Sequence, residues 1–286
     1  MLPELAADLP AIALEAEGRL ISLKWHKLRR RREDSAFARA NLEAGLAAGA
    51  VVEVDLVATA DGDLVCLHDL TLDGETTGKG QVAAQPSAAV LALRQRDSAG
   101  RPTESRVLSL GEIVELLRAN PPADPPDGRV QLDLKEPPAG ITPDVRRRFA
   151  AALGELGGWF TLSGPGWPAV ERLAAAVPGL ATGFDPEDAI ETGMAPDEVP
   201  RYLLETAPSA RIFYLDHLFV LDCLAKRQNP IAPLRAAGKR VDCWTLDADH
   251  DRVLEQLEAL IGAGADQITT NDPERLSQLW RERSGR

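Results

Sequence analysis

The chain has 286 residues, of which 44% are hydrophobic and 27% are charged, values that are typical of a globular protein and exclude a collagen-like or disordered chain. The formal net charge of −12 argues against a protein that binds nucleic acid over a broad basic surface. No stretch approaches the roughly 18 to 20 apolar residues that a membrane span needs, and three widely spaced cysteines favour a reducing, cytoplasmic location over a disulfide framework.

Short strand-like runs alternate with longer helical stretches along most of the chain. The strand-like runs lie at residues 20–25, 51–57, 130–135, 159–163, 181–185, 211–216, 240–246 and 266–270. Stretches with helical spacing between them include 35–48, 109–119, 145–156, 169–176 and 252–263. A strand followed by a helix, repeated eight times, is the pattern of a (β/α)₈ TIM barrel, so we predict this α/β fold in one domain over residues 1–286.

Three segments fall outside this repeat. Residues 1–18 have the pattern of a short leading helix, and residues 121–127 are rich in proline and are predicted to be an exposed loop. Residues 70–106 are too long for an ordinary connection between the second strand and its helix, so we predict an insertion over the active face. Glycines that precede strands are predicted to end helices in the left-handed conformation, at Gly49, Gly157, Gly158, Gly238 and Gly264.

Two carboxylates share one face of the second predicted strand. Glu53 and Asp55 are two residues apart, whereas Val52, Val54 and Leu56 point to the opposite face. Buried acids this close repel each other unless a proton or a cation lies between them, and Mg²⁺ or Ca²⁺ favours clustered carboxylate oxygens. The same acidic alternation is also common on half-exposed strands, so the pattern is compatible both with a metal site and with a solvated strand face.

A tight turn returns the chain beside this strand. Asp61-Gly62 is a strong turn signal, and residues 63–67 are apolar enough to run back antiparallel, ending at His68. The imidazole of His68 is thereby brought near the two carboxylates, and an ordinary histidine pKa of about 6.5 suits proton transfer at neutral pH. A structural role for His68 is the alternative.

The first strand ends in a histidine followed by basic residues. His26 falls at the C-terminal rim, where barrel enzymes place their reactive groups, so it can face His68 across the mouth. Lys27 adjoins it and is a candidate to contact an anion. Residues 29–32 are all arginine, and they indicate either a solvated loop or, as a weaker alternative, a nucleic-acid contact.

The third strand adds a further acid and a further cation to the same rim. Gln131, Asp133 and Lys135 share one face, so Asp133 is a third candidate carboxylate and Lys135 is suited to a phosphate oxygen. An internal Asp133–Lys135 salt bridge is the alternative. On the seventh strand, Trp244 is either an apolar wall for a bound group or part of the core.

These motifs, in this order, resemble the glycerophosphodiester phosphodiesterase family of TIM barrels. The resemblance extends over about residues 20–280 and is strongest over residues 49–69, with further matching segments at 71–72, 76–80, 108–112, 241–246 and 264–273. It departs from the family where His26-Lys27-Leu28 stands for the usual His-Arg-Gly, where Asp133 stands for the usual Glu, and where Glu75 stands for an Arg.

The resemblance implies a metal-dependent hydrolysis. Glu53, Asp55 and Asp133 would bind Mg²⁺ or Ca²⁺, His26 and His68 would act as acid and base, and Lys135 would help to hold the phosphate. The substrates would be glycerophosphodiesters or lysophospholipids, and glycerophosphodiesters would yield glycerol 3-phosphate and an alcohol. Two alternatives are a lyase like the sphingomyelinase-D-like barrels, which release a cyclic phosphate, and a non-catalytic barrel that binds phosphorylated ligands.

Overall fold

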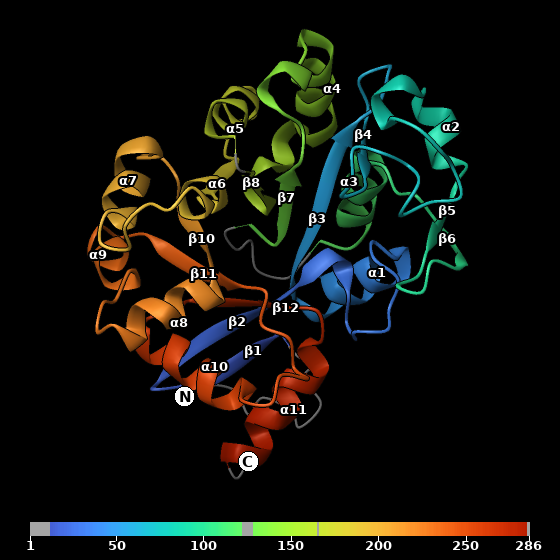
Figure 1. Cartoon of the computed structure of the whole chain (residues 1–286). Helices are drawn as coiled ribbons and strands as arrows, with labels where there is room; N and C mark the ends of the chain where they lie inside the picture. The colour runs from blue at the N-terminus through green and yellow to red at the C-terminus, as the bar shows by residue number, and fades with distance from the viewer. Residues whose placement is uncertain (1–11, 122–127, 165, 285–286) are drawn as a thin grey trace.

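The computed structural model describes residues 12–121, 128–164 and 166–284, and its centre is a closed barrel of parallel strands (Figure 1). Hydrogen bonds join the strands in the order β2, β12, β11, β10, β9, β8, β7, β3, and a β2–β3 pairing closes the ring. The predicted barrel is confirmed, and no predicted strand end is displaced by more than two residues. The barrel strands are β2 (Arg19–Trp25), β3 (Val51–Ala58), β7 (Val130–Leu134), β8 (Phe160–Ser163), β9 (Ala181–Phe184), β10 (Ile212–Asp216), β11 (Arg240–Trp244) and β12 (Gln267–Thr270).

Helices surround the strands (Figure 1). They are α1 (Arg39–Ala48), α3 (Leu110–Ala119), α4 (Pro143–Leu153), α5 (Trp167–Ala174), α6 (Glu187–Glu191), α7 (Val199–Thr206), α8 (His217–Ala225), α9 (Ile231–Ala236), α10 (Val253–Ala263) and α11 (Pro273–Ser284). Helix α3 begins at a capping box, in which Ser109 and Glu112 each satisfy the other's backbone N–H. Helices α1 and α10 end at left-handed glycines, Gly49 and Gly264, as predicted.

Two helix ends differ from the prediction by more than two residues. Helix α1 begins at Arg39 rather than at 35, because Phe37 has a φ of 52° and its N–H donates to the Lys27 carbonyl. Helix α4 ends at Leu153, and Gly154, whose φ is 53°, begins a 3₁₀ segment (Gly154–Trp159). Gly157 and Gly158 therefore do not cap the helix in the left-handed conformation.

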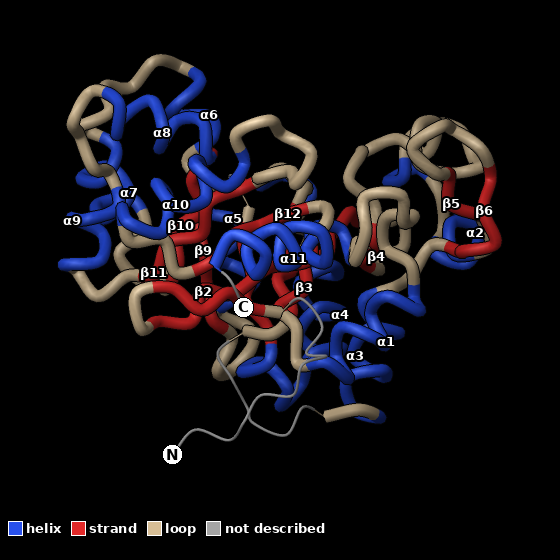
Figure 2. The backbone as a smooth tube through the Cα atoms, turned by 90° about the horizontal axis from the view of Figure 1, so that it is seen from below, coloured by secondary structure: helices blue, strands red, loops and turns tan. Residues whose placement is uncertain are grey.

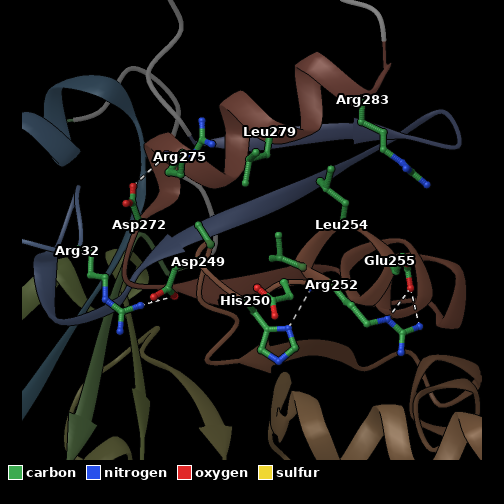
Figure 3. A pocket seen from close by; sticks show the side chains of 13 residues that line it. Arg32, Asp249, His250, Arg252, Leu254, Glu255, Asp272, Arg275, Leu279 and Arg283 are labelled. Atoms are coloured by element: carbon green, nitrogen blue, oxygen red, sulfur yellow. Dashed lines mark hydrogen bonds and ion pairs between the residues drawn. The ribbon is translucent and has the colours of Figure 1, made fainter.

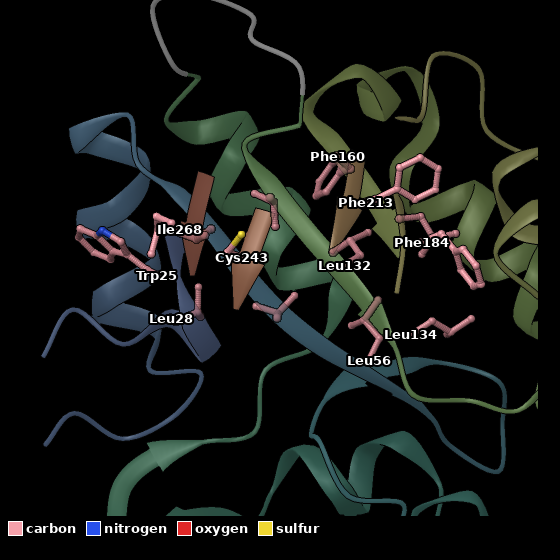
Figure 4. Close-up of a cluster of buried hydrophobic side chains, with 14 of the residues drawn as sticks. Trp25, Leu28, Leu56, Leu132, Leu134, Phe160, Phe184, Phe213, Cys243 and Ile268 are labelled. Carbon is pink, nitrogen blue, oxygen red and sulfur yellow. The ribbon is translucent and has the colours of Figure 1, made fainter. Parts of the chain in front are cut away.

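The hydrophobic core lies between the strands and the helices (Figure 4). Strand residues that face outward are fully or almost fully buried there; they include Val52, Val54 and Leu56 of β3 and Leu132 and Leu134 of β7. Since side chains alternate along a strand, the residues between them face the barrel interior. This alternation places polar side chains, such as those of Glu53 and Asp55, in the barrel interior.

The predicted leading helix is wrong over its last part. Ala13–Ala16 forms β1, which pairs antiparallel with the first half of β2. Leu14 and Ala16 are buried whereas Glu15 is exposed, a period of two that suits a strand. Glu17 and Gly18 both have positive φ, as a two-residue hairpin turn of type I′ requires. Residues 1–11, and residues 122–127 of the predicted loop, lie outside the described residues.

An insertion follows the returning strand β4 (Leu64–Cys66), which pairs antiparallel with β3 as predicted. It contains a 3₁₀ turn (Val82–Ala84), α2 (Ser87–Leu91) and the small antiparallel sheet β5 (Arg94–Arg96) and β6 (Pro102–Arg106). In Figure 2 these elements stand at one side of the barrel. They share a small hydrophobic cluster of their own with the β3–β4 hairpin: Val57, Val65, Leu67, Leu72, Val82, Val90 and Val107.

One carboxylate ties the hairpin turn to this insertion. Asp61 accepts hydrogen bonds from the Thr59 hydroxyl at 2.7 Å, the Ser87 N–H at 2.9 Å and the Ser87 hydroxyl at 2.8 Å. These bonds lower the pKa of Asp61 to about 2, from an ordinary value of 3.8. Because the folded-state pKa is lowered, the ionised group stabilises the fold above pH 4, and this stabilisation is lost as the pH falls toward 2.

Replacing Asp61 by alanine is therefore expected to destabilise the protein at pH 7, by less than about 1 kcal/mol because the carboxylate is exposed and screened. The difference from the wild type should shrink as the pH falls from 4 to 2, which urea unfolding at several pH values measures. Asp251→Asn, at another exposed position, is the control. Equal stability of the wild type and D61A at pH 7 would contradict this role for Asp61.

Among the described residues, no helix is long and apolar enough to cross a membrane. The three cysteines, Cys66, Cys223 and Cys243, are buried and free.

Candidate active site

The eight predicted site residues converge at the C-terminal ends of the barrel strands. A cavity of about 210 Å³ there is lined by His26, Lys27, Glu53, His68, Asp133, Lys135 and Trp244. The eighth residue, Asp55, is buried and contacts Lys27 and Lys135. These side chains come from β3, β7, β11, the segments that follow β2 and β7, and the turn after β4.

Three carboxylates form a cluster in this cavity. Glu53, Asp55 and Asp133 each offer an oxygen, and these oxygens lie within 4.8 Å of one another. The β3–β7 register places Asp55 opposite Asp133, which accounts for their proximity. Glu53 is 4% exposed and Asp55 is 1% exposed, so the alternative of a solvated strand face is wrong.

Two lysines approach the cluster. Lys135 Nζ lies 3.0 Å from Asp55 Oδ1 and 2.5 Å from Asp133 Oδ2, so the ion pair considered as an alternative is present beside the carboxylate cluster. Lys27 Nζ lies 3.6 Å from Asp55 Oδ2, and the Lys27 N–H donates to Glu53 Oε2 at 2.6 Å. Lys27 and Leu28 both have left-handed backbones, with φ of 53° and 59°, in the turn where the family usually has glycine after the basic residue.

The charges in the cluster shift one another's pKa values. Burial, and then the charge of Glu53, raises the pKa of Asp55 to about 7. Burial also opposes ionisation of Asp133, but the Lys135 ammonium and hydrogen bonds from Lys135 and Ser163 outweigh it and hold the Asp133 pKa below its usual value. Despite burial, Asp133 and Asp55 raise the pKa of Lys135, which keeps this lysine charged.

The donor set fits a divalent cation. Three carboxylates supply the hard oxygen ligands that Mg²⁺ and Ca²⁺ prefer. Asp55 Oδ2 is buried and accepts no hydrogen bond from the part of the chain that the structure describes. A buried acceptor without a hydrogen bond calls for a partner, and a cation would be one. Glu53, Asp55 and Asp133 could therefore hold a metal ion.

The two histidines lie in different environments. His26 is half-buried, and its Nδ1 lies 2.8 Å from Asn271 Oδ1. Burial, and then the charge of Lys27, lowers the pKa of His26 to about 4, so this imidazole is neutral at physiological pH. The side chain of His68 is 44% exposed, and its Nδ1 lies 2.9 Å from Asp69 Oδ1.

Glu75 holds the turn that carries His68. Its Oε2 accepts the backbone N–H groups of His68 at 2.8 Å and Asp69 at 2.9 Å. Glu75 is one of the positions at which the sequence departs from the family, and here the departure supplies a carboxylate that can accept two N–H groups. The insertion thereby holds the backbone of the turn that carries one of the two imidazoles.

A layer of polar residues in the barrel interior was not predicted from the sequence. Lys24 Nζ lies 3.2 Å from Asp242 Oδ2 and 4.3 Å from the centroid of the Tyr214 ring, and it hydrogen-bonds the side-chain oxygen of Gln131. Lys24, Gln131 and Tyr214 also line the cavity. The position of Lys24 on β2, two residues before His26, is the sequence signal that could have predicted this layer.

A larger pocket of about 550 Å³ lies elsewhere, beside α11 and the segment before α10 (Figure 3). Its arginines are largely engaged by acids: Arg32 pairs with Asp249 and Arg252 with Glu255. It contains none of the eight predicted site residues. Since its charges are satisfied locally, we take the smaller cavity as the candidate active site.

The arginine run beside His26 is likewise tied to neighbouring acids. Arg30 and Arg31 both pair with Glu274 of α11, and Arg29 donates to Asn271. These contacts favour the interpretation of a surface loop over that of a nucleic-acid contact.

The barrel and its cavity together define an α/β barrel whose site at the C-terminal ends of the strands combines carboxylates, lysines and histidines. Residues 38–131, about a third of the chain, match the model of the Glycerophosphoryl diester phosphodiesterase family. This match covers the segment over which the sequence motifs resemble the family most strongly. No curated protein sequence matches the chain significantly.

Solved structures with the same fold cover nearly the whole chain. A protein of Silicibacter pomeroyi assigned as a glycerophosphoryl diester phosphodiesterase has a TM-score of 0.75 and 20% identity, over 96% of this chain and 97% of its own. A glycerophosphodiester phosphodiesterase of Agrobacterium tumefaciens has a TM-score of 0.63 and 20% identity, over 89% and 98%. A phosphodiesterase of Oleispira antarctica, solved in complex with its product sn-glycerol-3-phosphate, has a TM-score of 0.66 and 19% identity, over 91% and 96%.

Proposed function

We propose that this protein hydrolyses glycerophosphodiesters to glycerol 3-phosphate and an alcohol, with Glu53, Asp55 and Asp133 holding Mg²⁺ or Ca²⁺. The observation that supports this most strongly is the convergence of three carboxylates, two lysines and two imidazoles on one cavity. The glycerol 3-phosphate bound to the Oleispira antarctica neighbour supports the substrate class.

Lys27 and Lys135 bind the phosphate. A phosphodiester resists attack because its negative charge repels nucleophiles, and cations beside its oxygens stabilise the charge that develops in the transition state. Both ammonium groups line the cavity and lie next to the acidic cluster. A bound divalent cation would add Lewis-acid stabilisation of the same charge. Trp244 lines the cavity and supplies an apolar wall for the glycerol or the head group.

His26 is the base and His68 is the acid. A neutral imidazole can accept a proton, and His26 is kept neutral by burial. As the oxygen of an attacking water bonds to phosphorus, a proton of that water passes to His26; as the bond between phosphorus and the alcohol oxygen breaks, His68 gives a proton to the leaving oxygen. The exposure of His68 allows it to regain a proton from solvent.

Phosphorus NMR of the products tests this function. The substrates are glycerophosphocholine, glycerophosphoethanolamine, glycerophosphoinositol and lysophosphatidylcholine, each with Mg²⁺ or Ca²⁺, and we expect linear glycerol 3-phosphate from at least one glycerophosphodiester. A cyclic phosphate product would overturn hydrolysis in favour of a lyase. Binding of these phosphodiesters without any turnover would instead identify a non-catalytic barrel.

A further inference from the structure

Asn271, directly after β12, contacts three polar side chains. Its Oδ1 lies 2.8 Å from His26 Nδ1 and 3.1 Å from Arg29 Nη1. Its Nδ2 lies 2.8 Å from Asp247 Oδ1. Asn271 thus connects the imidazole of the candidate base to a carboxylate that lies outside the acidic cluster.

The chemistry of its neighbours fixes the orientation of this amide. A guanidinium can only donate, so the Asn271 atom that faces Arg29 must be the oxygen. An ionised carboxylate can only accept, so the atom that faces Asp247 must be the NH₂ group. The two constraints are independent, and they agree.

The amide orientation in turn fixes the imidazole. An amide oxygen can only accept, so the His26 nitrogen next to it must carry the hydrogen. In a neutral imidazole only one nitrogen carries a hydrogen, and the hydrogen bond at one nitrogen decides which. The other nitrogen, Nε2, therefore keeps its lone pair.

We propose that Asn271 is a positioning residue that holds His26 in the Nδ1–H tautomer, so that Nε2 is the nitrogen that accepts the proton. The role of Nε2 in catalysis rests on the proposed function, whereas the tautomer does not.

Both ends of this hydrogen-bond chain are anchored. Arg29 is held by a second hydrogen bond, from its Nε to the Asp34 carbonyl at 3.2 Å. Asp247 is approached by Arg32, whose Nη1 lies 3.4 Å from Asp247 Oδ2. The Leu246 N–H donates to the carbonyl of Thr269 at 2.9 Å, which joins the segments that carry Asp247 and Asn271. These contacts restrict the rotation of the amide and hence the choice of tautomer.

The experiment is side-chain ¹⁵N NMR of histidine-labelled protein near neutral pH. The chain has 4 histidines, so the His26 signals can be assigned by their loss in His26→Ala. In the wild type we expect a protonated Nδ1 and an unprotonated Nε2. Asn271→Leu removes the acceptor and should shift His26 toward the Nε2–H tautomer, whereas Asn271→Asp keeps an acceptor and should retain Nδ1–H. Asn120→Leu, at the end of α3, is the matched control.

An Nε2–H tautomer in the wild type would overturn the proposal, and that measurement needs no variant to fold. Persistence of Nδ1–H in a folded N271L would also overturn it. If the wild type hydrolyses glycerophosphodiesters, N271L should lower kcat by roughly 10- to 100-fold with little change in KM, since partners that orient a working imidazole contribute about this much. N271D should recover part of the loss. A wild type that shows the Nδ1–H tautomer but no hydrolysis would refute the proposed function and leave the tautomer inference intact.

Discussion

Replacing His26 by alanine is expected to lower turnover by roughly 10² to 10⁴-fold, the contribution typical of a positioned acid or base. His26 is neutral because burial and the adjacent Lys27 lower its pKa to about 4, so in the wild type it can accept a proton at every pH above that value. His68→Ala should lower turnover within the same range, because the alcohol then leaves without a proton. Steady-state rates with a glycerophosphodiester measure both effects.

Substrates with different leaving groups separate the two roles. A nitrophenyl ester of glycerol phosphate releases a weakly basic phenolate that needs no proton, so His68→Ala should cleave it at close to the wild-type rate. His26→Ala should remain impaired with this ester, because the nucleophile still needs a base. His250→Ala, outside the cavity, is the control, and circular dichroism checks the fold. Near-normal turnover of the ordinary substrate by either variant would remove that imidazole from the mechanism.

The barrel could be predicted because its signals are local. Each strand is a short, largely apolar run. Its outward-facing apolar residues recur at a period of two, as Val52, Val54 and Leu56 do. The segment at Ala13–Ala16 was misassigned because four residues do not distinguish a strand from a helix turn. Its alternation becomes decisive only when β2 is present to bury Leu14 and Ala16.

The candidate site could be predicted in part, for the same reason. Glu53 and Asp55 share a strand face, and a turn signal returns His68 toward them, so sequence spacing alone groups these residues. The distant residues that determine the protonation state and orientation of the site's side chains could not be predicted. Asn271 lies 245 positions from His26 in the sequence, and the contact between them exists only because the barrel closes.

The buried Lys24–Asp242 pair illustrates the same limit. Each residue lies on a strand with apolar neighbours, and neither spacing nor composition links the first strand to the seventh. Glu75 is a further case, because an acid in the insertion gains its role only when the turn at His68 folds against it. Long-range polar contacts therefore decide the protonation state and orientation of groups whose positions the sequence indicates.

Removing the divalent cation is expected to lower turnover by at least roughly 10²-fold, since Lewis-acid stabilisation of a phosphoryl transition state contributes several kcal/mol. Chelation should have this effect, and added Mg²⁺ or Ca²⁺ should reverse it. Asp55→Asn should have a similar effect that no added metal reverses, because it replaces the buried carboxylate whose Oδ2 accepts no hydrogen bond within the described residues. Asp222→Asn, an exposed position on α8, is the control. Full activity in the presence of chelator would contradict a metal-dependent reaction.

Direct measurement of metal binding tests most sharply whether Glu53, Asp55 and Asp133 form one cation site. Titration of the metal-free protein with Mn²⁺, followed by electron paramagnetic resonance, counts bound ions without any need for turnover. The carboxylate cluster predicts a single tightly bound ion that Mg²⁺ or Ca²⁺ displaces, with binding lost in Asp55→Asn and retained in Asp222→Asn. Absence of a bound ion in the wild type, or equal binding by Asp55→Asn, would contradict a single cation site at Glu53, Asp55 and Asp133.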